Sequence, residues 1–381
     1  MVVNLFEDVL EDVKGLIKLG HICIDNNVFR CHYKASVIIL IAFSILNTSG
    51  QFFGDPIDCL CSDEIGDDKN DLLDSYCWIH STFTLPKALH KKVGLEVAHP
   101  GVDQYKPDDV KVYHKYYQWV WLVLFLQSLM FYIPRYVWKL CEGGRIKSLV
   151  FDLDKPVLKP SEKQEKLGLL VLYLKSNIRY HNSYFFYFVI CEVMNFANVI
   201  IQIYLVDGFL GGAFTTYGTD VLKYTEQDQE KRVDPMIATF PRMTKCTFHQ
   251  YGPSGDVQRH DALCILRLNI LNEKMYIFLW FWFLFLAAIS GLVVLYRLII
   301  IFVPAFRYLV LRSRARMTDP NHLKLVMEVS KIGDWFLLYL LCKNIDRQNF
   351  KELIQEYTKE IVDDGSGQHL MAYPDNPDKL K

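Results

Sequence analysis

The sequence predicts an all-α membrane protein with four transmembrane helices. Hydrophobic residues make up 51% of the 381 residues and aromatic residues 14%, and they gather in four blocks instead of being spread along the chain. This apolar content and its grouping exclude a disordered chain, a coiled coil and a collagen, and make an ordinary cytosolic enzyme a poor fit. Only 22% of the residues are charged. The 42 basic and 43 acidic residues balance to a net charge of −1, so the chain carries no signature of a nucleic-acid partner.

Each apolar block has the length that a membrane helix requires. About 20 mostly apolar residues cover the roughly 30 Å of hydrocarbon in a bilayer. We expect four spans, at 35–53, 116–138, 184–206 and 275–303. The stretch 275–296 contains no charged residue. It is about twice as long as the average helix of a globular protein, which disfavours a buried helix of a soluble protein.

Pro134 lies near the end of the second block, where we expect a kink. Proline has no backbone N–H, and its ring clashes with the preceding turn of a helix. In a membrane the carbonyl freed near Met130 must find another partner. We favour a static kink that only shapes packing, and a gating hinge ahead of the loop that begins at Arg135 is the alternative.

The basic residues predict an orientation. They concentrate after the second and fourth blocks and before the first and third, and the cytoplasmic flanks of membrane helices carry the excess of Lys and Arg. The sequence therefore places 1–34, 139–183 and 304–381 in the cytoplasm, and 54–115 and 207–274 outside the cell.

The C-terminal segment is expected to hold a helical region followed by a tail. Residues 332–342 are apolar apart from Gly333 and Asp334, and they are too few to cross a bilayer. They suit the core of a small helical domain. The tail from Asp363, with its Gly, Pro and Asp, is predicted to be disordered.

Five of the ten cysteines fall in the two segments predicted to lie outside the cell. They are Cys59, Cys61, Cys77, Cys246 and Cys264. An oxidising compartment permits disulfides, and two loops of this size have little room for a core, so crosslinks would stabilise them. The sequence alone does not fix which cysteine pairs with which.

The sequence contains no complete metal-ligand pattern and no catalytic motif among those we considered. Cys59-x-Cys61 and Cys246-x-x-His249 are fragments of zinc-ligand spacing, and neither is accompanied by a second complete pair. The sequence contains no P-loop, GxGxxG, HExxH or GxSxG motif. We therefore expect no metal site, no cofactor and no catalytic residue.

Six short motifs, in the same order along the chain, resemble those of one known family. They are GDPIDC (54–59), YCWIHSTFT (76–84), YYQWV (116–120), FPRMTKCTFHQYGPSGDVQRHDALC (240–264), NEKMYIFLWFWF (272–283) and GDWFLLY (333–339). With them, and with two matching cysteines in each outer loop, the chain resembles the innexins, the invertebrate gap-junction proteins, and most closely those of insects. The resemblance covers 26–350.

The resemblance implies a subunit with an N-terminal pore helix, disulfide-linked extracellular loops and a cytoplasmic helical domain. Such subunits form a ring of about eight, homomeric or mixed with other innexins, in contact with membrane lipid. Two rings on adjacent cells dock and pass ions and small metabolites, and undocked rings open as hemichannels. The alternative function is a non-conducting four-span adhesion or scaffold protein.

The family pattern also implies two disulfides, Cys59 with Cys264 and Cys77 with Cys246. This sequence departs from the pattern at Cys61, an extra outer cysteine, and at Arg267, where innexins usually have proline. The extra cysteine leaves an odd number of outer thiols.

The N-terminal segment is a candidate for the pore. Its apolar residues follow helical spacing, and the acids Glu7, Asp8, Glu11 and Asp12 lie between them. We expect no cleavable signal peptide here, because a signal begins with positive charge. A helix on the membrane surface is the alternative, but such helices favour Lys and Arg. Innexins fold this segment toward the pore mouth, where the four acids would favour cations.

The third block carries a polar stripe. Glu192, Asn195, Asn198 and Gln202 fall within one third of the circumference of a helix. Polar groups that face lipid are costly, so the stripe should face protein or water. We favour hydrogen bonding between helices over pore lining, because in innexins the first span is nearer the pore.

Overall fold

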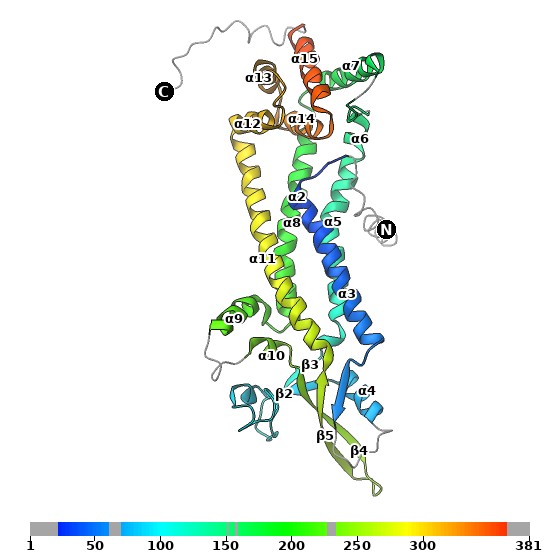
Figure 1. Cartoon of the computed structure of the whole chain (residues 1–381), viewed down its shortest axis with the longest axis vertical. Helices are drawn as coiled ribbons and strands as arrows, with labels where there is room; N and C mark the ends of the chain where they lie inside the picture. Colours follow the sequence, from blue (N-terminus) through cyan, green and yellow to red (C-terminus); the bar gives the residue numbers. More distant parts are fainter. Residues whose placement is uncertain (1–21, 61–69, 151, 157–158, 227–233, 364–381) are drawn as a thin grey trace. The chain divides into compact units, whose positions relative to one another are not determined.

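The computed structural model describes residues 22–60, 70–150, 152–156, 159–226 and 234–363 (Figure 1). The candidate pore residues Glu7, Asp8, Glu11 and Asp12, the extra cysteine Cys61 and residues 364–381 of the predicted tail lie outside the described residues. The chain divides into two compact units. The helical unit comprises 1–34, 132–196 and 289–381, and the sheet unit comprises 35–131 and 197–288.

Four long apolar helices in the described residues confirm the predicted architecture. They are Asn27–Phe52, α5 (Val120–Glu142), α8 (Asn182–Phe209) and α11 (Arg267–Phe302). The first consists of α2 (Asn27–Arg30), a π-helical segment η1 (Cys31–Ser36) and α3 (Val37–Phe52).

The first, third and fourth long helices begin before their apolar blocks, whereas the second begins at Val120, inside its block. The first starts at Asn27, not at residue 35, because the Asn26 side chain caps it by accepting a hydrogen bond from the backbone N–H of Phe29 at 2.7 Å. The fourth starts at Arg267, not at residue 275. Charged residues at a helix end continue the helix but lower the hydropathy, so an apolar block understates the helix length. At Pro134 the helix α5 continues on both sides.

The sheet unit contains a five-stranded sheet that the sequence analysis does not predict. Its order is β1-β5-β4-β2-β3, and every pair is antiparallel. The strands are β1 (Ile57–Leu60), β2 (Thr82–Thr84), β3 (Val112–His114), β4 (Met243–Tyr251) and β5 (Val257–Leu266). β4 and β5 form a long hairpin whose turn includes Gly255, with a φ of 89° that favours glycine.

Short helices complete the sheet unit. They are α4 (Asn70–His80), η3 (Pro86–His90), η4 (Tyr116–Gln118), α9 (Phe214–Glu226) and α10 (Pro235–Thr239). The helix α4 packs against β1 and β4. The buried core between them includes Ile57, Leu73, Tyr117 and Leu266 together with the cysteines Cys59, Cys77, Cys246 and Cys264.

The helical unit is built around one apolar helix. Its further elements are α6 (Arg145–Val150), α7 (Pro160–Ser176), α12 (Pro304–Arg314), α13 (Pro320–Val329), α14 (Ile332–Asn344) and α15 (Arg347–Asp363). The helix α14, which covers the expected core segment 332–342, is buried over most of its length and contacts α6, α12 and α15. α7 and α13 pack against α15.

Candidate functional site

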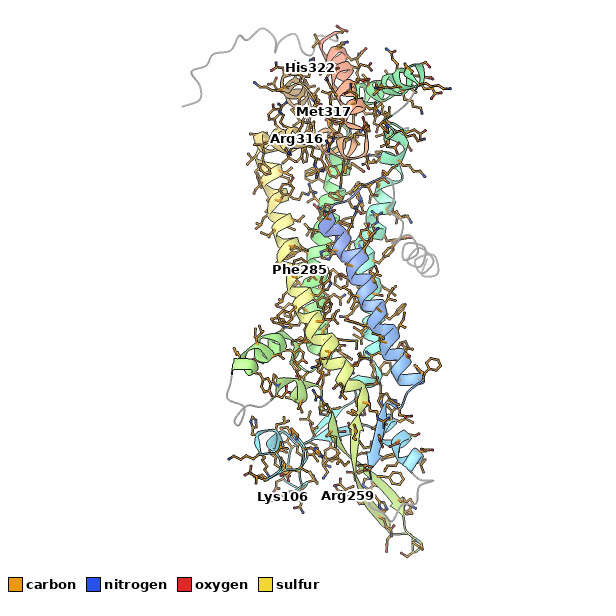
Figure 2. All side chains as sticks on the ribbon, viewed as in Figure 1. Lys106, Arg259, Phe285, Arg316, Met317 and His322 are labelled. Carbon is orange, nitrogen blue, oxygen red and sulfur yellow. A yellow bond between two sulfur atoms is a disulfide. The ribbon has the colours of Figure 1, made fainter. Side chains whose placement is uncertain are left out.

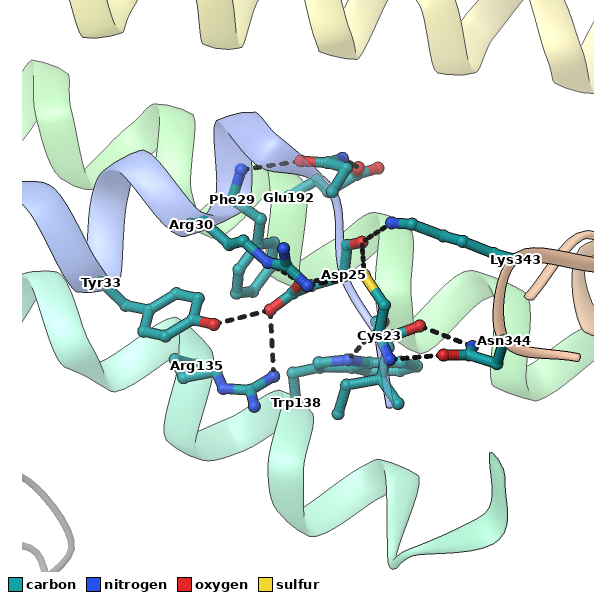
Figure 3. Close-up of polar contacts among 12 residues, drawn as sticks. Cys23, Asp25, Phe29, Arg30, Tyr33, Arg135, Trp138, Glu192, Lys343 and Asn344 are labelled. Carbon is teal, nitrogen blue, oxygen red and sulfur yellow. Dashed lines mark hydrogen bonds and ion pairs between the residues drawn. The ribbon is translucent and has the colours of Figure 1, made fainter. Parts of the chain in front are cut away.

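The carboxylate of Asp25 is the centre of a buried polar cluster in the helical unit (Figure 3). Arg30 Nε donates to Asp25 Oδ1 at 2.7 Å, and the Tyr33 hydroxyl donates to Asp25 Oδ2 at 2.8 Å. Arg135 Nη1 lies 3.4 Å from Asp25 Oδ2, and its guanidinium also lies over the Tyr33 ring. We call Asp25, Arg30, Tyr33 and Arg135 the Asp25 cluster. It ties the residues ahead of the first long helix to α5.

The backbone on either side of Ile24 is held by three further side chains (Figure 3). The amide of Asn344 accepts a hydrogen bond from the Cys23 N–H at 2.5 Å and donates one to the Cys23 carbonyl at 2.9 Å. The indole of Trp138 donates to the Ile24 carbonyl at 3.1 Å, and Lys343 Nζ donates to the Asp25 carbonyl at 2.6 Å. We call residues 22–26, which form no helix or strand, the linker. These hydrogen bonds attach the linker to α5 and to the end of α14.

Glu192 of the predicted polar stripe forms a buried ion pair with Arg297 of α11. The guanidinium donates from Nε to Glu192 Oε2 at 2.5 Å and from Nη2 to Oε1 at 2.9 Å. Asn26 also donates to Oε1. The residues Glu192 and Arg297 are 4% and 5% exposed. A buried charge is tolerated when it is paired and hydrogen-bonded, and this pair meets both conditions.

The other three residues of the stripe are buried as well. In the sheet unit, Gln127 Nε2 of α5 donates to Gln202 Oε1 at 3.0 Å, and Gln202 Nε2 lies 3.4 Å from Asn198 Oδ1. Asn195 lies in the helical unit beside a small cavity that Asn26 and Glu192 also line. All four predicted residues thus face protein within this chain.

Two disulfides join the two segments between the long helices. Cys59 of β1 bonds to Cys264 of β5, its neighbour across the strands, and Cys77 of α4 bonds to Cys246 of β4. These are the pairs that the innexin pattern implies. The sulfurs of Cys59, Cys77 and Cys264 lie within 4.8 Å of one another, but all three are in disulfides, which leaves no thiolate to hold a metal ion there.

The YYQWV motif connects the second long helix with the sheet. Tyr117 is buried against Trp78, with ring centroids 4.7 Å apart, and Gln118 donates to the Trp78 carbonyl. The Tyr116 hydroxyl donates to the carbonyl of Thr239 at 3.3 Å. The motif therefore packs the start of the second long helix against the sheet unit, and the side chains of Tyr116 and Gln118 donate to backbone carbonyls.

Arg267, at the position where the resemblance implies proline, forms ion pairs with Asp55 and Asp58. It lies at the first residue of α11, and its guanidinium reaches Asp55 Oδ2 at 3.2 Å and Asp58 Oδ2 at 2.7 Å. Proline is tolerated at the first residue of a helix because the N–H there has no partner within the helix. Arginine leaves the helix intact and ties its start to β1. The pair is exposed, so it adds little stability.

Sequence reasoning missed the partners of the polar sites. Neither Arg297 nor the set of Asp25, Arg30 and Arg135 is among the candidate residues that the sequence predicts. One signal was available for Arg297: it lies within a run of apolar residues that continues to Phe302, where an unpaired charge would be costly. For Asp25 the sequence gives no comparable signal, because its partners come from 5 to 110 residues away.

Comparison with known proteins agrees with this geometry. The innexin family model matches residues 25–361. Innexin inx2 of Drosophila melanogaster is 53% identical over 368 residues, which cover 96% of this chain and 99% of the fly protein. Innexin inx2 of Schistocerca americana is 54% identical over 93% of this chain and 98% of its own length. Innexin shaking-B of Drosophila melanogaster is 45% identical over 95% and 96%. The resemblance seen in the motifs is confirmed: the chain belongs to the innexin family of gap-junction channel proteins.

Proposed function

We propose that this chain is a subunit of a gap-junction channel that docks between adjacent cells and passes ions and small metabolites. The observation that carries the proposal is the combination of four long apolar helices with a sheet that two disulfides crosslink, in a chain that the innexin family matches over residues 25–361. A rigid crosslinked sheet offers a fixed surface for docking. The two disulfides also favour an oxidising compartment for the sheet.

The proposed topology follows from the disulfides and the basic flanks. Segments 54–115 and 207–274 lie outside the cell, and 1–34, 139–183 and 304–381 lie in the cytoplasm. The long helices carry large exposed apolar side chains, among them Phe281 and Phe285 of α11. Figure 2 labels Phe285. Such side chains suit contact with lipid or with neighbouring subunits.

The assembly belongs to the same proposal. About eight subunits form a ring, homomeric or mixed with other innexins, and a ring on the adjacent cell docks with it. An undocked ring acts as a hemichannel. The partners are innexins and membrane lipid, and nucleic acid is not among them.

Three groups of residues receive proposed roles. The acids Glu7, Asp8, Glu11 and Asp12 bias the inner mouth of the pore toward cations. The stripe Glu192, Asn195, Asn198 and Gln202 serves packing between helices, which the burial of all four supports. The disulfides of Cys59 with Cys264 and Cys77 with Cys246 hold the docking surface.

We favour a static kink at Pro134 that only shapes packing, and a gating hinge is the alternative. The continuous helix on both sides of Pro134 agrees with a static role. Replacing Pro134 with alanine separates the two roles. A hinge requires a shifted voltage or pH dependence of closure at normal surface expression, whereas an unaltered gating curve excludes it.

The alternative is a non-conducting four-span adhesion or scaffold protein. Conductance between paired cells that express the chain, alone and opposite a second innexin, decides between the two. The channel proposal predicts junctional current and dye transfer. Firm cell contact without current in every pairing would support the scaffold.

A further inference from the structure

A cavity of about 950 Å³ lies within the helical unit, at the end shared by two of the long helices. The first residues of α8 contribute Asn182 and Phe186, and the end of α11 contributes Ile301. The rest of the wall comes from α12, from α13 and from the start of α14. Figure 2 labels Arg316 and Met317 in the turn from α12 to α13, and His322 in α13. The cavity therefore lies at the ends of two helices that are long and apolar enough to cross a bilayer.

The wall of the cavity is held by hydrogen bonds at the α11–α12 junction. The helix α11 ends at Phe302, Val303 is extended, and Pro304 begins α12. The Arg307 guanidinium donates to the carbonyls of Ile300 and Ile301, each at 2.7 Å. The Trp335 indole donates to the Arg307 carbonyl at 2.8 Å. The bonds from Arg307 satisfy two of the free carbonyls at the end of α11, and the bond from Trp335 attaches α12 to α14.

One side of the cavity is apolar and the other is basic. The apolar side chains are Phe186, Ile301, Pro304, Ala305, Met327 and Ile332. Lys324 and Lys331 supply two exposed ammonium groups, and neither forms an ion pair within the part of the chain that the structure describes. Glu328 is the single acid of the wall. Arg307 adds a third positive charge, so the wall carries a net positive charge.

We infer that this cavity binds an anionic phospholipid of the inner leaflet, its phosphate near Lys324 and Lys331 and its acyl chains along the apolar wall. The inference rests on the proposed topology, which places this end of α8 and α11 at the cytoplasmic face. The cytoplasmic leaflet carries the anionic lipids, and basic residues at its surface attract them. A free phosphate would meet the same lysines but would leave the apolar wall exposed to water.

The test uses the purified full-length channel titrated with phosphatidylserine, with phosphatidylcholine of the same acyl chains, and with inorganic phosphate. The double variant K324Q/K331Q should bind phosphatidylserine about tenfold or more weakly, since each lysine contributes to the attraction, and should bind phosphatidylcholine as the wild type does. E328Q should bind phosphatidylserine more tightly, because it removes the one repulsive charge. The matched control K351Q/K359Q, on α15 outside the wall, should leave both affinities unchanged.

Two results overturn the inference. One is phosphatidylserine binding in K324Q/K331Q equal to that of the control. The other is inorganic phosphate that displaces the lipid at equal concentration, which marks a site for soluble anions. If K324Q/K331Q fails to assemble, the variant E328Q is the test. An affinity of E328Q for phosphatidylserine equal to that of the wild type would then overturn the inference.

The lipid measurement does not depend on conduction. Lipid binding without junctional current would overturn the proposed function and leave the cavity assignment intact. Junctional current without selectivity for phosphatidylserine would overturn the cavity assignment and leave the proposed function intact.

Discussion

Arg297 of α11 donates two hydrogen bonds to Glu192 of α8, and both side chains are almost fully buried inside the helical unit. The pair joins two of the long apolar helices at a place where an uncompensated charge would be costly. Asn26 adds a third hydrogen bond to the same carboxylate. Asn26 directly follows Asp25. The buried carboxylates of Asp25 and Glu192 therefore both form hydrogen bonds at the start of the first long helix.

The Glu192–Arg297 pair predicts a non-additive mutation cycle. E192Q removes one charge and leaves the guanidinium buried without its partner, which costs about 3–5 kcal/mol in comparable cases. The double variant E192L/R297L removes both charges and should recover most of this loss. Thermal unfolding of the purified protein measures both. The control is E162Q on α7, where the carboxylate is exposed. Equal stability of E192Q and E162Q would contradict the account.

The Asp25 cluster predicts local loosening of the linker at 22–26. D25N keeps the shape of the side chain but removes the charge that Arg30 and Arg135 face. Hydrogen exchange of the Cys23 and Phe29 amides should become faster, and stability should fall by about 1–3 kcal/mol. D152N removes an exposed carboxylate and should change neither. Unchanged exchange in D25N would show that the charge does not hold the linker.

The four N-terminal acids predict a modest cation preference. A ring of subunits multiplies each charge at the inner mouth, and a wide pore keeps its water. Neutralising Glu7, Asp8, Glu11 and Asp12 together should reduce the preference seen in reversal potentials across a salt gradient. The preference should also shrink at high salt, where screening shortens to about 3 Å at 1 M. Unchanged reversal potentials would place the acids away from the pore.

His114 predicts that acid weakens the edge of the sheet. Its Nε2 lies 2.8 Å from the Thr84 hydroxyl, and burial lowers its pKa from 6.5 to about 4. Between these values the unfolded imidazole binds a proton that the folded one does not, so the unfolding free energy falls as the pH drops from 6.5 toward 4. The loss is about 2 kcal/mol at pH 5.

Hydrogen exchange of 82–84 and 112–114, corrected for intrinsic rates, should show the effect of His114 at pH 5 against pH 7.5. H114Q has no imidazole, so its exchange in these two strands should not depend on pH in this way. A pH dependence in H114Q as steep as in the wild type would assign the effect to another group.

The disulfides predict one peptide map. Digestion without reduction should yield peptides that link Cys59 to Cys264 and Cys77 to Cys246. Cys61, which lies outside the described residues, should be free or should form a disulfide in only a minor fraction of the protein. Its free thiol should react with an alkylating reagent. A dominant bridge from Cys61 to Cys246 or Cys264 would overturn this pairing.

Hydropathy could predict the long helices but not their ends. An uncharged stretch such as 275–296 predicts a span by composition alone. The helix that contains it starts at Arg267, because a charged side chain at the interface continues the helix without raising the hydropathy. The polar stripe could be found from helical spacing, which is a local property.

The sheet and the polar partners depend on contacts distant in sequence. Strands such as Thr82–Thr84 are too short for alternation to mark them. The β4–β5 hairpin did carry a signal, since Gly252, Pro253 and Gly255 lie between two stretches that contain β-branched and aromatic residues. Asp25 and Arg135 lie 110 residues apart, and only the folded chain brings them together.

Junctional conductance between paired cells tests the central claim most directly. Cells that express the wild type should pass current to a partner cell that expresses a compatible innexin. The variant C77S/C246S, which lacks the α4–β4 disulfide, should reach the surface with little or no junctional current, and C141S, which removes a free cysteine of α5, should conduct as the wild type does. Absence of current in every wild-type pairing, or full current in C77S/C246S, would contradict the account.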